Sequence, residues 1–137
     1  MSVTIRQAAA KGGPVNALVI DDSSTMRLIL TRFLVKMGFQ VVEATNGREA
    51  LQRLREMGRP DLVLVDWNMP EMNGMDFVRS VRADRRFDDL PLVMVTTNTE
   101  LEHVAEALEA GANEYVMKPF TMDVIREKLG LLGFLEA

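Results

Sequence analysis

The sequence contains no cysteine, so disulfide bonds, thiolate metal sites and cysteine nucleophiles are all excluded. It contains one histidine, His103, which we interpret as a surface residue of a helix rather than as a phosphoryl donor or a metal ligand. No apolar run approaches the roughly 18 residues that a membrane-spanning helix needs. The N-terminus lacks the positive-then-apolar pattern of a secretion signal. These absences favour a cytoplasmic protein that is not inserted into a membrane.

The chain also lacks a basic run or stripe, and its 16 basic and 20 acidic residues give a formal net charge of -4. Nucleic acid is therefore not expected as a direct partner. The 137 residues are about the size of one domain. Residues 1–14 show no sustained periodicity, so we expect a flexible leader there and a single domain over residues 15–137.

After the leader, short apolar runs alternate with helical patterns, as in repeated βα units. The run Leu62–Val65 is apolar at every position, which is typical of a strand buried on both faces of a parallel sheet. The charged segment 84–89 is expected to be a surface loop. We predict an α/β fold with strands at residues 17–20, 41–44, 62–66, 92–96 and 115–117, and helices at 24–37, 47–57, 75–83, 99–110 and from 121 onwards.

Polar side chains stand at the ends of four of the five predicted strands. Asp21 and Asp22 follow the first strand, Asp66 ends the third, Thr96 ends the fourth and Lys118 follows the fifth. In a parallel sheet these ends share one edge, so the side chains are expected to converge there. Close carboxylates need a compensating cation, and oxygen ligands suit Mg²⁺. A carboxylate beside Mg²⁺ and an ammonium group is placed to attack phosphorus and form an acyl phosphate.

Four motifs resemble the receiver domain of two-component response regulators, and most of all its single-domain chemotaxis members. The resemblance covers roughly residues 16–130, and it implies a flavodoxin-like, doubly wound, five-stranded parallel sheet of order 2-1-3-4-5 with five helices. The motifs are Asp21-Asp22 with Ser24-Thr25-Met26-Arg27, Asp66-Trp67-Asn68-Met69-Pro70, Arg82-Ala83-Asp84, and Lys118-Pro119-Phe120-Thr121.

The resemblance implies a role for each residue at the strand ends. Asp66 would accept a phosphoryl group from a phosphohistidine on a sensor histidine kinase. Asp21, Asp22 and Asp66 would hold Mg²⁺ together with the backbone carbonyl of Asn68. Lys118 would pair with Asp66 at rest and with the phosphoryl oxygens afterwards.

A switch is implied by two further residues of the same family pattern. The Thr96 hydroxyl would move to bond a phosphoryl oxygen, and Tyr115 would rotate into the space that it leaves. In receivers the peptide between Lys118 and Pro119 is typically cis, although only about 5% of X-Pro bonds in folded proteins are.

The output is expected to be protein–protein binding by a monomeric receiver, on the face formed by the fourth strand, fourth helix and fifth strand. The chain ends soon after the last predicted helix, so no separate output domain is expected. A flagellar motor switch or another signalling protein would fit as the target. Enteric chemotaxis members carry two lysines where this chain has Glu100 and Leu101, and a glutamate where it has Asn98. The target and the lifetime of the phosphoaspartate therefore stay open.

Other functions share parts of this residue pattern. A receiver in a phosphorelay outside chemotaxis would carry the same residues. A phosphatase of the haloacid-dehalogenase type also uses an aspartate after a strand, but it needs a second aspartate two residues on, where this chain has Asn68. A flavin mononucleotide carrier of the same fold would need a Ser/Thr/Gly-rich phosphate loop that is missing. The intact acidic pair, Thr96 and Lys118 argue against a receiver that works without phosphorylation.

Overall fold

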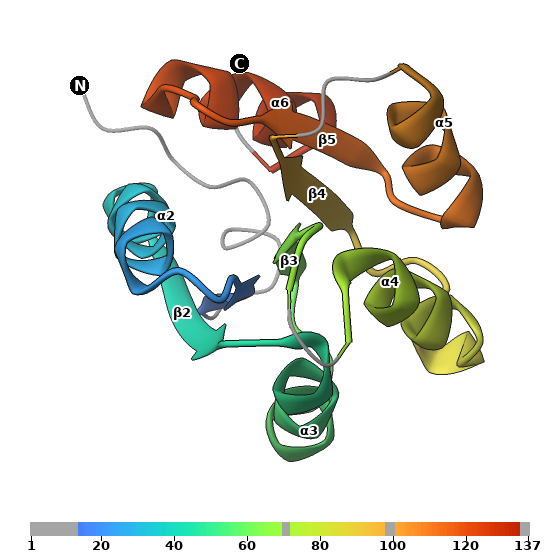
Figure 1. Ribbon diagram of the computed structural model, residues 1–137. Coiled ribbons are helices and arrows are strands. Elements are labelled where there is room, and N and C mark those ends of the chain that lie inside the picture. The colour runs from blue at the N-terminus through green and yellow to red at the C-terminus, as the bar shows by residue number, and fades with distance from the viewer. Residues whose placement is uncertain (1–13, 70–71, 98–100, 135–137) are drawn as a thin grey trace.

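A computed structural model describes residues 14–69, 72–97 and 101–134, with the side chains of residues 101 and 102 excepted. Its strands form one parallel sheet of order β2-β1-β3-β4-β5 (Figure 1), which confirms the expected topology. The strands are β1 Val15–Ile20, β2 Phe39–Ala44, β3 Leu62–Asp66, β4 Leu92–Thr96 and β5 Glu114–Met117.

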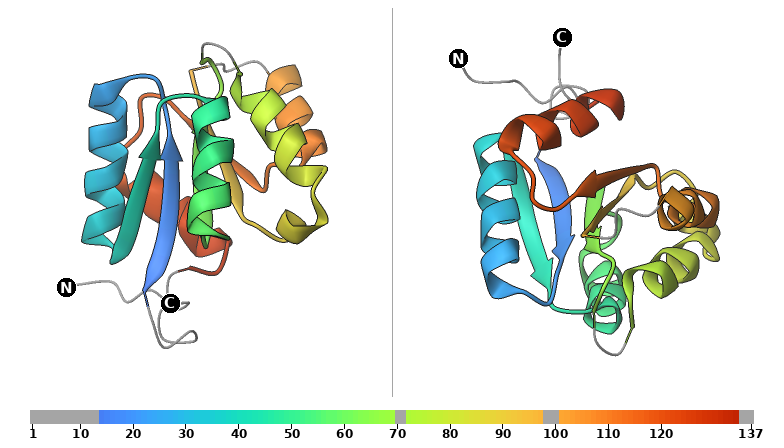
Figure 2. Two further views of the ribbon diagram at one scale, coloured as in Figure 1. Left: turned by 90° about the horizontal axis from the view of Figure 1, so that it is seen from below. Right: turned by 45° about the horizontal axis from the view of Figure 1, so that its top comes forward.

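Five α-helices cover this sheet within the described residues, as expected. Helices α2 and α6 lie on one face, and α3, α4 and α5 lie on the other (Figures 1 and 2). A short 3-10 helix, η1, occupies Arg85–Phe87 in the segment that was expected to be a plain loop. The α-helices are α2 Ser24–Lys36, α3 Gly47–Met57, α4 Gly74–Arg82, α5 Leu101–Ala110 and α6 Met122–Leu131.

The first two strands each begin two residues earlier than predicted. Asn16 and Gln40 are polar, so the apolar runs in the sequence start only after them. In the sheet these two residues pair with each other across β1 and β2. Backbone hydrogen bonding thus extends both strands beyond the apolar pattern, because the ladder does not depend on side-chain polarity.

Side-chain caps fix where four helices begin. Ser23, Asn46, Asn73 and Thr121 each accept a hydrogen bond from the backbone amide three residues further on. Such caps satisfy amides that the first helical turn leaves without partners. Ser23 is the cap of α2, at the position directly before the predicted start of that helix. Each capped helix starts at the sheet edge where the preceding strand ends.

The central strand β3 is buried along its whole length. Leu62 and Leu64 pack against the layer that contains α2 and α6, and Val63 and Val65 pack against the layer that contains α3, α4 and α5. This explains the uninterrupted apolar run, because the side chains of a strand alternate between the two faces of its sheet. Asp66, the last residue of β3, is therefore held at the end of a strand packed on both faces.

Near the C-terminus, Phe134 is fully buried, with its ring centroid 5.7 Å from that of Phe39. Leu131, in contrast, is 68% exposed. The predicted leader lies, except for Pro14, outside the described residues. Along the described ranges, no helix has both the length and the apolar character that crossing a membrane requires.

Candidate functional site at the carboxyl edge of the sheet

Three aspartates meet where β1 and β3 end. Asp21, Asp22 and Asp66 each offer a carboxylate oxygen, and these oxygens lie within 4.8 Å of one another. Asp21 is fully buried and Asp66 is 6% exposed, whereas Asp22 faces solvent. Because β1 and β3 are neighbours in the sheet, residues that are 45 positions apart in the chain become adjacent. The donor set consists of oxygens alone, which fits a hard divalent cation such as Mg²⁺.

Lys118 reaches this cluster from the end of β5. Its Nζ donates to Oδ2 of Asp21 at 3.0 Å and to Oδ1 of Asp66 at 3.2 Å. Its backbone amide donates to the carbonyl oxygen of Thr96 at 2.8 Å, which ties the ends of β4 and β5 together. The peptide between Lys118 and Pro119 is cis, as the resemblance implied. The ammonium group thus bridges two of the three carboxylates.

The electrostatics of Asp66 follow from this crowding. Burial, and then the charge of Asp21, raise the pKa of Asp66 from 3.8 to about 6, and Lys118 offsets only part of that rise. For Lys118 itself, burial favours the neutral amine, but its hydrogen bond to Asp21 and the charges of Asp66 and Asp21 outweigh burial and raise its pKa. A charged ammonium group and a carboxyl group with a pKa of about 6 therefore lie together at the strand ends.

Thr96 and Tyr115 lie on neighbouring strands beside the cluster. Thr96 is buried at the end of β4, and Tyr115 is half-buried in β5. Lys128 of α6 holds its Nζ 4.7 Å from the centre of the Tyr115 ring and 3.0 Å from Oε1 of Glu114. This cation–π contact could not be predicted from residue patterns, because it joins a strand and a helix across a turn.

The loop after β3 packs tightly against the start of α4. The amide of Gly74 donates to the carbonyl oxygen of Trp67 at 2.9 Å. A Cβ at position 74 would collide with the backbone carbonyl of Asp66, so this close approach requires glycine. Asn68 is exposed in the same loop, two residues beyond Asp66, and its role as a metal ligand stays a prediction. Pro70 lies outside the described residues, as do Asn98 and Glu100.

Two contacts at this edge were missed by sequence reasoning. His103 was expected at the surface but is half-buried, with its ring centroid 5.5 Å from that of Trp67. Arg27 donates from Nη1 to the backbone carbonyl of Asp21 at 2.7 Å and pairs with Glu43 at 3.3 Å. A bond to a backbone carbonyl leaves no trace in the identity of the residue that accepts it, so no sequence pattern could reveal the second contact.

The fold and this cluster together define a class of protein. A sequence profile of the response regulator receiver domain matches residues 17–130. The chain therefore belongs to the response regulator receiver family. Within that family it resembles CheY chemotaxis regulators, whose sequences and structures are similar to it over most of its length.

Three of these relatives illustrate the likeness. Chemotaxis protein CheY1 of Helicobacter pylori strain J99 is 49% identical over 113 residues, which are 82% of this chain and 91% of that protein. Chemotaxis protein CheY of Pseudomonas aeruginosa is 46% identical over 82% of this chain and 90% of its own length. The structure of CheY4 of Vibrio cholerae superposes with a TM-score of 0.81 at 33% identity, covering 87% of this chain and 98% of that one.

The raised pKa of Asp66 predicts how stability depends on pH when no metal is bound. An unfolded carboxyl group titrates near 3.8 and the folded one near 6, so between these values the folded state binds more protons. The free energy of unfolding of the wild type should therefore fall as pH rises through this window. Asp66→Asn removes that loss, and we expect the variant to be more stable than the wild type by about 2 kcal/mol at pH 7.5.

Urea denaturation in EDTA at pH 5 and pH 7.5 measures this difference. Asp123→Asn, which changes an exposed carboxylate on α6, is the matched control and should follow the wild type. An Asp66→Asn variant that is less stable than the wild type at pH 7.5, or equally dependent on pH, contradicts the assigned electrostatics.

Proposed function

We propose that the chain is a response regulator that accepts a phosphoryl group on Asp66 in a Mg²⁺-dependent reaction. The observation that carries the proposal is the cluster at the sheet edge, with three carboxylates within 4.8 Å and Lys118 bonded to two of them. In the proposed transfer a carboxylate oxygen of Asp66 attacks phosphorus. The bond between phosphorus and the histidine nitrogen of a sensor kinase breaks, and an acyl phosphate forms.

The neighbours of Asp66 have distinct tasks in this proposal. Asp21, Asp22, Asp66 and the backbone carbonyl of Asn68 would hold Mg²⁺, which supplies positive charge opposite the oxygens of the phosphoryl group. The Lys118 ammonium already lies 3.2 Å from Asp66 and would follow the charge onto the phosphoryl oxygens. The domain acts as a phosphoacceptor switch and does not turn over a separate substrate.

A downstream protein would recognise the switched state on the face made by β4, α5 and β5. The Thr96 hydroxyl would bond a phosphoryl oxygen, and Tyr115 would turn inward into the space that it leaves. The similarity of the chain to CheY proteins supports a role in cytoplasmic chemotaxis signalling. A monomeric receiver would then bind a downstream protein, such as a flagellar motor switch, in its phosphorylated state.

The single tyrosine of the chain allows the switch to be tested directly. With 3-fluorotyrosine incorporated, Tyr115 gives one ¹⁹F resonance. We expect Mg²⁺ with beryllofluoride, a phosphoryl mimic, to move that resonance as the ring changes its surroundings. In Thr96→Ala the displacement should be largely lost, because the hydroxyl that couples the site to Tyr115 is absent.

Thr97→Ala serves as the control, since Thr97 is the exposed neighbour of Thr96. It should respond like the wild type. A resonance that beryllofluoride does not move in the wild type would overturn the switch role of Tyr115, and an unchanged response in Thr96→Ala would overturn the role of Thr96.

A further inference from the structure

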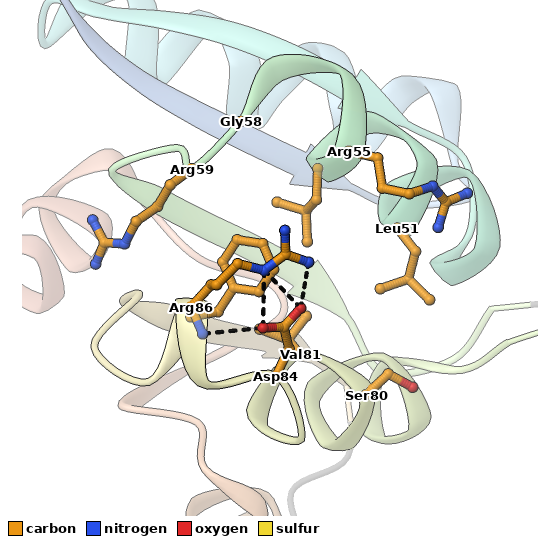
Figure 3. Close-up of a pocket in the computed structure, with 10 residues that line it drawn as sticks. Leu51, Arg55, Gly58, Arg59, Ser80, Val81, Asp84 and Arg86 are labelled. Atoms are coloured by element: carbon orange, nitrogen blue, oxygen red, sulfur yellow. Dashed lines mark hydrogen bonds and ion pairs between the residues drawn. The ribbon is translucent and has the colours of Figure 1, made fainter.

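A groove that includes none of the residues of the aspartate cluster lies between α3 on one side and α4 with η1 on the other (Figure 3). It is a groove of about 400 Å³, within the usual range for small-molecule sites. The groove is formed by the second half of α3 and by the end of α4. These helices start where the strands end, so the groove lies toward the opposite edge of the sheet.

The floor of the groove is apolar, and part of it is exposed to solvent. Leu54 and Val81 line it and are almost fully buried in the core. Leu51 and Phe87 also line it, but they are only half-buried. Covering such surface with another apolar group would be favourable, at about 25 cal/mol for each Å² removed from water.

The walls carry guanidinium groups, in a chain whose net charge is -4. Arg55, Arg59 and Arg86 line the groove, against a single carboxylate, that of Asp84. Arg86 binds Asp84 at 2.7 Å and lies 5.6 Å from the centre of the Phe87 ring (Figure 3). The groove is therefore a basic pocket on an acidic protein.

The other two arginines are available to a ligand. Among the described residues, Arg59 pairs with Asp89 alone, at 3.0 Å, and that carboxylate is 89% exposed. Arg55 is exposed and forms no ion pair with any residue that the structure describes. An exposed pair of this kind contributes little, so Arg59 can exchange its partner at low cost.

We propose that this groove binds a small organic anion. Its apolar body would lie on Leu51 and Phe87, and its carboxylate or phosphate group would bind either Arg55 or Arg59, whose guanidinium groups lie at opposite ends of the groove (Figure 3). Guanidinium groups suit this task because their planar donors match the oxygens of either anion. The excess of arginine selects an anion over a neutral or cationic ligand of the same shape. The site is separate from the aspartate cluster and does not depend on phosphorylation of Asp66.

A matched pair of probes tests the proposal on the intact chain. 1-Naphthylacetate carries an apolar body and a carboxylate, and 1-naphthylacetamide keeps the shape without the charge. Two-dimensional amide NMR should show that naphthylacetate shifts the resonances of residues 51–59 and 80–87. The amide should bind roughly fivefold more weakly, the effect of one exposed charge pair. Inorganic phosphate and phenyl phosphate, tested alongside, distinguish a carboxylate from a phosphate preference.

Substitutions of arginine test which guanidinium groups bind the anion. Arg55→Gln with Arg59→Gln should weaken naphthylacetate binding roughly fivefold, as for the amide, because one exposed charge pair is lost in either case. Arg48→Gln removes an exposed arginine of α3 that lies outside the groove, and it should bind like the wild type. Asp66→Asn should also bind normally, which separates this inference from the proposed phosphoacceptor function.

Three outcomes overturn the proposal. Shifts that map elsewhere, or that the amide produces equally well, show that no anion site exists in the groove. Unchanged binding in the double arginine variant shows that the guanidinium groups do not recognise the anion. If naphthylacetate has no effect while an acidic peptide shifts the same resonances, the groove is a peptide-docking surface instead.

Discussion

Incubation with acetyl phosphate and Mg²⁺ is expected to produce a phosphorylated form of the wild type that Asp66→Asn does not produce. The substitution replaces a carboxylate, which can form an acyl phosphate, by an amide that cannot serve as this nucleophile. Asparagine has almost the same shape, so the position at the end of β3 is retained. Intact-mass spectrometry measures the phosphorylated fraction directly, and we expect complete loss of that species in the variant.

Two further variants show whether the loss is specific. Asp76→Asn changes an exposed carboxylate in the first turn of α4 and should be phosphorylated like the wild type. Asp22→Asn leaves the acceptor intact but removes one proposed metal ligand, so its phosphorylation should need more Mg²⁺ than that of the wild type. Phosphorylation of Asp66→Asn to the wild-type level, or mapping of the phosphoryl group to another residue, would contradict the assignment of Asp66.

The largest effect on stability outside the apolar core is expected from Arg82→Ala. Arg82 donates from Nε to the carbonyl oxygen of Gly111 at 3.0 Å and from Nη2 to that of Leu90 at 2.7 Å. It also bonds Oδ1 of Asn113 at 2.9 Å and the carbonyl oxygen of Phe87. One side chain thus joins the end of α4 to the segments before β4 and β5. Removing it leaves partly buried carbonyl groups without donors, at a cost of about 3 kcal/mol.

Chemical denaturation of Arg82→Ala measures this loss. Arg85→Ala, an exposed arginine of η1, is the matched control and should change stability by less than about 0.5 kcal/mol. Arg82→Lys keeps the positive charge but lacks the planar fork, so it should recover only part of the stability. Equal stability of Arg82→Ala and Arg85→Ala would show that the hydrogen bonds of Arg82 contribute nothing.

The parallel α/β class and the aspartate cluster could be predicted because the relevant signals are local, whereas the strand order was implied by the family resemblance alone. The apolar run Leu62–Val65 predicts a buried strand, and the polar residue that follows a strand lies at one edge of a parallel sheet. The alternation of strands and helices therefore predicts that Asp21, Asp66 and Lys118 lie close together, without any knowledge of distances. The three central strands β1, β3 and β4 are almost wholly buried, which supports this logic.

The remaining features arise from contacts between separate elements. The arginines of the α3–α4 groove look like ordinary surface residues until two helices bring them together. Arg82 was recognised only as part of a motif, because its partners are backbone carbonyls in distant loops. The contact of His103 with Trp67 depends on how α5 packs beside the loop after β3. Residue identity and periodicity carry no information on such packing.

The fluorescence of Trp67 tests most directly whether Asp66 is the phosphoacceptor of a magnesium site. Trp67 is the only tryptophan of the chain and follows Asp66 directly. Mg²⁺ is titrated first, and beryllofluoride is then added, to the wild type and to Asp66→Asn. We predict a saturable change with Mg²⁺ in the wild type and a further change with beryllofluoride that Asp66→Asn lacks. A wild type that does not respond to Mg²⁺, or an Asp66→Asn variant with the full response, would contradict the claim.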